Sequence, residues 1–395
     1  MLRPVAGGVT AARGFRAGGV AAGLKPSGRR DLALVVADAP AGCAVTTTTN
    51  QVKAAPCVVT EEHARNGRAR AVVVNAGNAN ACTGDRGLAD ARSTAAAVGA
   101  RLGVDPTDVL VLSTGIIGVP MPMDRLLAGI GPLVGDLAGD GGDRAAEAIT
   151  TTDTTVKTVA YEVRDDHGTC TVGGMAKGAG MIEPAMATML CVLTTDAPLA
   201  GAVLRPMLRQ AVARSFNRIS IDACGSTNDT VALLASGASE QPPGLAALQV
   251  AIEAVCADLA LAIVRDGEGT TKVGYLTVRG AATEEDAAGL ARAIAGSTLF
   301  RAALHGADPN WGRILAAMGA SSITFEPARV SVTCGGVQVC RFGVATAFDR
   351  GQAAAAMGRA DVEVVVDLGL GRAGTTFLTA DLTPDYVAEN AYYTT

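Results

Sequence analysis

The feature that most constrains how this chain can fold lies at residues 173–195, where a glycine-rich run leads into an apolar run. The stretch reads GGMAKGAGMIEPAMATMLCVLTT, and its glycines predict a backbone that bends or approaches another backbone closely, rather than a packed element. The apolar residues 189–193 predict a buried strand, but Ala187 and Thr188 precede it instead of ordinary turn residues. Thr188 is therefore either a strand former with a satisfied hydroxyl or a residue whose hydroxyl has a chemical task.

Cleavage of the chain between Ala187 and Thr188 would give that hydroxyl a task. Thr188 would become a new N-terminus, and its own α-amine could activate its hydroxyl as a nucleophile. Such chemistry needs no histidine, and none of the three histidines lies in a ligand-like pair. The nine cysteines are an odd number without a C-x-x-C spacing, which argues against a disulfide framework or a zinc site and favours a reducing, cytoplasmic compartment. We expect neither a metal nor an organic cofactor.

The residues around this position resemble one known family. KGAGMIEP at 177–184, followed by MATMLCVLTTDA at 186–197, is similar to the self-cleavage signature of the ornithine acetyltransferases, the glutamate N-acetyltransferases of arginine biosynthesis. The resemblance covers essentially the whole chain. It implies that Thr188 is the nucleophile. It also implies an alpha chain of residues 1–187 and a beta chain of residues 188–395, which form one catalytic unit after self-cleavage.

A second apolar run, residues 109–112, leads into Ser113, Thr114 and Gly115. A strand that ends in Thr-Gly-x-x-Gly exposes backbone N–H groups where the chain turns, which is what an oxyanion hole requires. Residues 113–118 match the family's S-T-G-x-I-G motif, so the resemblance implies that Thr114 and Gly115 are the oxyanion-hole residues. The preceding loop, NAGNANACTG at 75–84, is dense in Asn and Gly, and is either a structural turn or a functional loop.

Further family motifs imply the residues that bind substrate. By this resemblance they are Thr154, Lys177, Thr188, Glu268, Asn390 and Thr395. An anionic Glu268 suits the δ-ammonium of ornithine, and a cationic Lys177 suits a carboxylate. The chain departs from the family pattern at Ala223, where glycine is usual, and at Thr394, where many members carry arginine. A charge contact from position 394 is therefore absent here.

The order of apolar and amphipathic segments predicts an α/β protein. We expect strands at residues 31–38, 71–74, 109–112, 159–163, 170–172, 189–193, 273–278, 362–368 and 375–383, with a hairpin over 329–339, and helices at 90–102, 123–137, 143–150, 199–216 and 246–265. The resemblance implies a layered, DmpA-like α/β sandwich, in which sheets are packed between helices and Thr188 starts a central strand. We find no internal repeat and no flexible linker.

Bulk composition limits the partners. The chain of 395 residues is 49% hydrophobic but only 3% aromatic, so its core must be built from aliphatic side chains. The net charge of -5 argues against a nucleic acid or an anionic membrane as partner. Residues 109–123, the longest uncharged window, are too few and too polar to span a bilayer. Residues 1–30 lack acids, as transit peptides do, but they resemble the family's mature start, so we expect them in the fold.

Together the motifs imply an acyltransferase that moves the acetyl group of N2-acetyl-L-ornithine to L-glutamate by a ping-pong scheme through an acetyl ester on Thr188. Bifunctional family members also use acetyl-CoA, which stays open here. The family further implies a heterotetramer of two alpha and two beta chains. One alternative is an N-terminal-nucleophile amidohydrolase or aminopeptidase of related fold. Another is an uncleaved binding protein that uses the glycine loops, although the chain has no G-x-x-x-x-G-K-[ST] run.

Overall fold

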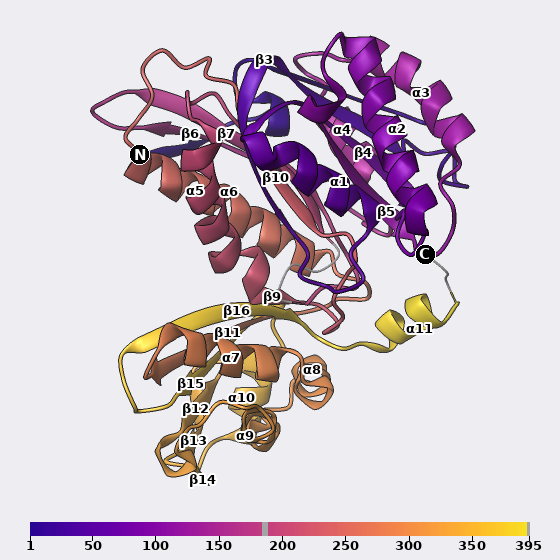
Figure 1. Cartoon of the computed structure of the whole chain (residues 1–395). Helices are drawn as coiled ribbons and strands as arrows, with labels where there is room; N and C mark the ends of the chain where they lie inside the picture. The colour runs from indigo at the N-terminus through magenta and orange to yellow at the C-terminus, as the bar shows by residue number, and fades with distance from the viewer. Residues whose placement is uncertain (184–188, 393–395) are drawn as a thin grey trace.

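Two sheets, each covered by helices, organise the computed structural model, which describes residues 1–183 and 189–392 (Figure 1). Within that part of the chain the larger sheet has nine strands in the order β1-β6-β7-β8-β10-β3-β4-β5, with β2 paired to β3. Its strands are β1 (Leu2–Pro4), β2 (Phe15–Val20), β3 (Leu32–Thr47), β4 (Arg68–Asn78), β5 (Val109–Ile116), β6 (Lys157–Arg164), β7 (Thr169–Lys177), β8 (Leu190–Thr195) and β10 (Thr230–Ala235). The expected strand at residues 189–193 is therefore a central strand of the larger sheet.

The smaller sheet is built almost entirely from the last third of the chain. Its described strands lie in the order β14-β13-β12-β15-β11-β16-β9. They are β9 (Ile219–Ser220), β11 (Val273–Ala281), β12 (Ser331–Cys334), β13 (Val337–Arg341), β14 (Val344–Ala345), β15 (Asp361–Asp367) and β16 (Ala373–Ala380). Figure 1 shows this sheet in orange and yellow below the larger lobe.

The helices form layers over the two sheets. They are α1 (Ala55–His63), α2 (Gly84–Leu102), α3 (Met123–Gly135), α4 (Gly142–Ile149), α5 (Gly201–Arg214), α6 (Leu245–Arg265), α7 (Glu284–Ala295), α8 (Thr298–His305), α9 (Trp311–Gly319), α10 (Arg350–Met357) and α11 (Pro384–Tyr392). Alternate residues of β8 enter two cores: Cys191 and Leu193 join the core shared with α5 and α6, while Leu190 and Val192 join the core shared with α4. Both faces of β8 are thus covered, as the expected α/β sandwich requires.

Residues 173–177 of the glycine-rich run form a packed strand. The expectation that this run is not a packed element was therefore wrong for these residues. These residues complete β7 and are buried. A Cβ atom on Gly173 would lie 2.0 Å from the Gly8 carbonyl oxygen, and one on Gly174 would lie 2.7 Å from the Leu193 side chain. The glycines therefore allow a packed strand whose neighbours come unusually close, which is the second of the two uses expected of them.

One described helix, α6, has the length and apolar composition of a membrane span. Half of its most apolar window is buried inside the protein, where it packs on α5, β6 and β7. That is typical of a core helix. The segment that most resembles a membrane span is therefore α6, and not residues 109–123, the longest uncharged window of the sequence.

Replacing Ala223 with glycine should raise the free energy of unfolding by about 0.5–1 kcal/mol. Ala223 has a φ of 61°, in the left-handed region that glycine adopts without strain. Thermal or urea unfolding measures the gain. As a control, Ala257→Gly in the exposed middle of α6 should lower stability by about 1 kcal/mol. If A223G were no more stable than the parent chain, the backbone strain assigned to this loop would be absent.

Candidate active site

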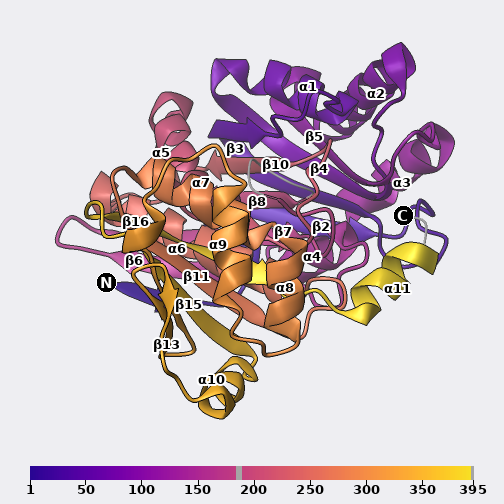
Figure 2. The same ribbon diagram turned by 90° about the horizontal axis from the view of Figure 1, so that it is seen from below.

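A cavity of about 220 Å³ gathers residues that the motifs had placed far apart in the sequence. Five of its lining residues are candidates from the sequence, namely Thr114, Gly115, Lys177, Glu268 and Asn390. They come from the ends of β5 and β7, the turn after α6, and α11. Figure 2 shows α11 leaving the smaller lobe to run beside the larger one, which is how Asn390 reaches this cavity. The structure therefore brings both halves of the chain to one place.

The end of β5 is held very close to β4. Gly115 has a φ of 132°, a conformation open essentially to glycine. A Cβ atom there would lie 2.3 Å from the Gly77 carbonyl carbon and 2.5 Å from the Asn78 nitrogen. Thr114 beside it is 2% exposed. The glycine at position 115 is thus required by the close pairing of the two strand ends, whatever its chemical role.

The asparagine-rich loop is hydrogen-bonded to this end of β5. The Ser113 hydroxyl donates to Asn75 Oδ1 at 2.6 Å, and Asn75 Nδ2 donates to the Asn78 carbonyl at 2.8 Å. From the loop before β10, Asn228 Nδ2 donates to the carbonyls of Ala79 (2.6 Å) and Ser113 (2.9 Å). Buried amide side chains that are fully bonded hold backbone rigidly. The loop at residues 75–84 therefore has at least a structural task, which is to position the Thr114–Gly115 backbone.

A buried cluster of charges lies behind Lys177. Asp153 is 4% exposed and accepts hydrogen bonds from Lys157 Nζ (2.7 Å) and Gly178 N (2.7 Å). Lys177 Nζ lies 4.0 Å from the other Asp153 oxygen. Burial alone would raise the pKa of Asp153, but the charges of Lys177 and Lys157 outweigh burial and lower it to about 2. Asp266, which ends α6, also pairs with Lys157.

Lys177 is a buried cation whose ion-pair partner among the described residues is Asp153. Its side chain is 3% exposed, and its contact with Asp153 is an ion pair at 4.0 Å rather than a hydrogen bond. Burial lowers the pKa of Lys177, while Asp153 acts in the opposite direction. An ammonium group that is desolvated and lines a cavity is suited to bind an anionic ligand group.

Glu268 lines the same cavity as Lys177. Its backbone N–H donates to the Ala179 carbonyl at 2.8 Å, and its carboxylate accepts from Asn390 Nδ2 at 2.9 Å. A Cβ atom on Gly180 would lie 2.5 Å from the Glu268 carboxylate. Glycine at position 180 is thus what lets the carboxylate lie against the segment that follows β7.

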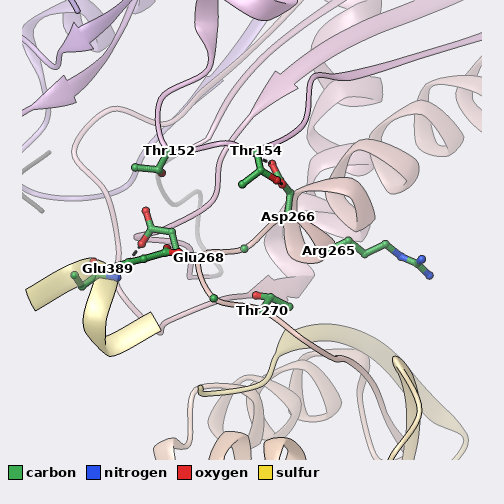
Figure 3. Close-up of a pocket in the computed structure, with 10 residues that line it drawn as sticks. Thr152, Thr154, Arg265, Asp266, Glu268, Thr270 and Glu389 are labelled. Atoms are coloured by element: carbon green, nitrogen blue, oxygen red, sulfur yellow. Dashed lines mark hydrogen bonds between the residues drawn. The ribbon is translucent and has the colours of Figure 1, made fainter. Parts of the chain in front are cut away.

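A second pocket, of about 500 Å³, adjoins the first and shares Thr152, Glu268 and Asn390 with it. Figure 3 shows Thr154 against Asp266 on one side of this pocket and Glu268 beside α11 on the other. The Thr154 hydroxyl and backbone N–H both donate to Asp266. Thr154 lines this second pocket and not the first, whereas Thr152 lines both.

Two predicted residues, Thr188 and Thr395, lie outside the described residues, as does Ala187. The residue that follows Thr188 is described: the Met189 backbone N–H donates to Asp229 Oδ1 at 2.8 Å. Before the gap, Glu183 accepts a hydrogen bond from the Ser220 hydroxyl at 2.8 Å. Burial raises the pKa of Glu183 to about 7.

Sequence analysis missed several residues that shape this site, namely Asp153, Lys157, Gly180, Asn228, Asp229 and Asp266. None of these positions had a local signal: Asp153 and Lys157 pair across a turn that leads into β6, where a spacing of four residues does not by itself predict an ion pair. Within the described ranges, no group of three or more His, Cys, Asp or Glu side chains could hold a metal ion. The nine cysteines, all of them described, are unpaired.

The chain is similar to known proteins in sequence and in structure. The model of the ArgJ family matches residues 16–395. The "Arginine biosynthesis bifunctional protein ArgJ" of Mycobacterium bovis is 50% identical over 394 residues, which cover 98% of this chain and 96% of that protein. The protein of the same name from Thermobifida fusca is 48% identical over 388 residues, which cover 98% and 100%. A crystal structure of Mycobacterium tuberculosis ornithine acetyltransferase complexed with ornithine is 50% identical. It covers 47% of this chain and 98% of that one, with a TM-score of 0.44.

Proposed function

This chain belongs to the ArgJ family, and we propose that it is an acyltransferase of arginine biosynthesis that moves the acetyl group of N2-acetyl-L-ornithine to L-glutamate. The products are L-ornithine and N-acetyl-L-glutamate. The observation that carries the proposal is the cavity that Lys177 and Glu268 line together with Thr114 and Gly115. It offers a cation, an anion and a rigid turn of backbone within one small space, which fits an amino-acid substrate with an acyl group.

In this proposal the nucleophile is Thr188, exposed by cleavage after Ala187. The α-amine that cleavage would free has a reference pKa of about 7.7–8.0, near the value that a general base needs at neutral pH. It sits on the same residue as the hydroxyl that it activates, so no separate histidine is needed. Met189 is the first described residue after this position, and it leads directly into the central strand β8.

The transfer has two half-reactions. The α-amine takes the Thr188 Oγ proton while Oγ bonds to the acetyl carbon, and Thr114 and Gly115 stabilise the oxyanion that forms. The carbon–nitrogen bond then breaks as the amine returns its proton to the leaving ornithine nitrogen. An acetyl ester remains on Thr188. The amine of glutamate attacks that ester, Oγ leaves and regains a proton, and N-acetylglutamate departs.

Substrate recognition follows from the charges of the cavity. Glu268 binds the δ-ammonium of ornithine, and the buried Lys177 binds a substrate carboxylate. Asn390 orients Glu268, to which it already donates. Thr154 and Thr395 complete the substrate-binding set that we propose. The relatives' name, a bifunctional protein, motivates acetyl-CoA as an alternative acetyl donor for glutamate.

The two chains of this proposal, residues 1–187 and 188–395, would remain together after cleavage. In the larger sheet β8 pairs with β7 on one side and β10 with β3 on the other, so strands from the second chain are enclosed by strands from the first. Separating the chains would break two complete ladders of a buried sheet. We further propose that two such units pair as a heterotetramer in the cytoplasm.

Product analysis tests the reaction. Purified protein is incubated with acetylornithine, with and without glutamate, and ornithine, acetate and acetylglutamate are quantified. We expect acetylglutamate in step with ornithine, and little acetate when glutamate is present. Ornithine and acetate that form at the same rate without glutamate would instead indicate an amidohydrolase. A parallel reaction with acetyl-CoA and glutamate tests the second donor.

Replacing Glu268 with glutamine should raise KM for acetylornithine by about 10- to 100-fold, since a charge-assisted hydrogen bond contributes about 1.5–3 kcal/mol. The variant keeps a carbonyl oxygen for Asn390 to bond, so the fold should survive. Steady-state kinetics measures the change. The control is Glu285→Gln, an exposed carboxylate at the start of α7 that lines neither pocket, which should leave KM unchanged. An unchanged KM in E268Q would remove the ammonium-binding role.

A further inference from the structure

Asp229 is a buried carboxyl group that the mechanism above does not use. It lies just before β10, which runs parallel to β8 with Thr230 opposite Leu190. The residue is 0% exposed. Its Oδ1 atom accepts the Met189 N–H at 2.8 Å, and Met189 is the residue that directly follows Thr188 in the chain.

The two oxygens of this carboxyl group differ in their hydrogen-bond partners. Among the described residues Oδ2 is buried without a hydrogen-bond partner. The nearby Thr48 has a single hydroxyl proton, which it donates to the Ser226 carbonyl at 2.8 Å. An unpaired acceptor in the interior costs about 1–3 kcal/mol, and it leaves a lone pair free to take up a proton.

We propose that Asp229 carries the proton during self-cleavage of the chain, an inference that rests on the function proposed above. Before cleavage the Thr188 nitrogen is part of a peptide bond and cannot act as a base. Another group must then take the hydroxyl proton. The candidate is Asp229, whose Oδ1 atom accepts the backbone N–H of the next residue, Met189, and whose Oδ2 atom accepts no hydrogen bond from the described residues.

The charges around Asp229 suit such a role. Burial raises its pKa well above the usual range of a carboxyl group, while the Met189 N–H and the Lys177 charge act in the opposite direction. From α1 the Cys57 thiol faces the Asp229 carbonyl, and burial raises the pKa of that thiol to about 12, so it stays neutral. A carboxyl group with a raised pKa is a stronger base than an ordinary carboxylate, and it can accept a proton and return it.

One group, Asp229, can both accept and return the proton that this reaction moves. Asp229 accepts the Thr188 Oγ proton as Oγ bonds to the Ala187 carbonyl carbon. When the Ala187–Thr188 carbon–nitrogen bond breaks, Asp229 returns this proton to the departing nitrogen, which becomes the free amine. An ester then joins Ala187 to Thr188 Oγ. Water hydrolyses that ester, which leaves a carboxylate on Ala187 and restores the hydroxyl.

The test is the variant Asp229→Asn in the full chain, followed by intact mass under denaturing conditions. Its Oδ1 atom can still accept the Met189 N–H, so we expect a folded protein with a circular dichroism spectrum like that of the parent. Cleavage should slow by about 100-fold or more, the usual contribution of a general base. The matched control is Asp222→Asn. Asp222 is a half-buried carboxyl group of the β9–β10 loop that accepts from Met181 and Ile182 instead, and this variant should still cleave.

A purely structural role for Asp229 would make different predictions. Freshly synthesised parent chain should cleave faster as the pH rises through the raised pKa of Asp229, and D229N should lack this rise. A D229N chain that cleaves at the parental rate overturns the proposal, and so does a parental cleavage rate that does not change with pH. The pH profile of the parent decides the matter if D229N does not fold. A parent chain that never cleaves overturns both this inference and the proposed function, whereas normal cleavage of D229N overturns this inference only.

Discussion

Thr188→Ala should yield a single chain of full length that turns over at least about 10⁴-fold more slowly than the parent, as other covalent enzymes do without their nucleophile. Removing the hydroxyl removes both the group that attacks the Ala187 carbonyl and the group that carries the acetyl ester. The parent protein should instead give two masses that sum to the precursor plus one water. Intact mass spectrometry and an ornithine-release assay measure both effects.

Thr188→Ser is the matched control for this prediction. Serine keeps a hydroxyl and, once cleaved, the same α-amine, so we expect cleavage and measurable turnover. Parental activity should rise with pH through the pKa of the α-amine, about 7.7–8.0. A cleaved and active T188A protein would contradict the assignment of the nucleophile, and an activity that is flat from about pH 6 to 9 would contradict the amine as base.

Gly115→Ala should destabilise the protein by about 2–5 kcal/mol and lower kcat by about 10²- to 10³-fold in whatever fraction still folds. Both losses have one cause. The added Cβ would lie 2.3 Å from the Gly77 carbonyl carbon, and the φ of 132° is strained for alanine. The end of β5 must then move away from β4, and the backbone N–H groups proposed to hold the oxyanion move with it. Urea unfolding and single-turnover kinetics separate the two losses.

Gly118→Ala provides the comparison, three residues further along the same turn. Gly118 also has a positive φ, of 82°, but nothing lies within 4 Å of where its Cβ would be. This variant should lose only about 1–2 kcal/mol from backbone strain and should keep most of its turnover. If G118A lost as much activity as G115A, the effect would stem from flexibility of the loop and not from the close contact with Gly77.

Several elements were readable from sequence because their signals are local. Strand β15 and helix α6 appear close to their expected bounds, since continuous apolar runs and long periodic runs carry the information that defines them. Strand β5 begins at Val109 as expected, but it continues to Ile116 instead of ending at residue 112. Strand β3 is longer than expected: residues 31–38 were predicted, and it extends over Leu32–Thr47. Its second half contains Pro40, Ala41 and Gly42, residue types of low strand propensity, and its strand character there comes from pairing with β4 and β10.

The candidate site also has a part that the sequence predicted and a part that only the structure shows. Short motifs singled out Thr114, Gly115, Lys177, Glu268 and Asn390, and the structure places all five around one cavity. It separates Thr154 from them, since Asp266 holds the hydroxyl of that residue. No motif indicated that the glycines at 173 and 174 belong to a packed strand, because the reason lies in Gly8 and Leu193, which are distant in sequence.

By itself the sequence determined the chemical types and the local frame: an aliphatic α/β chain, a nucleophile candidate before an apolar strand, and isolated charged residues in glycine turns. Only the tertiary structure decided which of these residues meet and what surrounds them. Lys177 became a desolvated cation, and Asp229 a buried carboxyl group with one oxygen that accepts no hydrogen bond from the described residues. The physical reason is that desolvation and charge pairing depend on every neighbour within a few ångströms, and most of those neighbours come from distant parts of the chain.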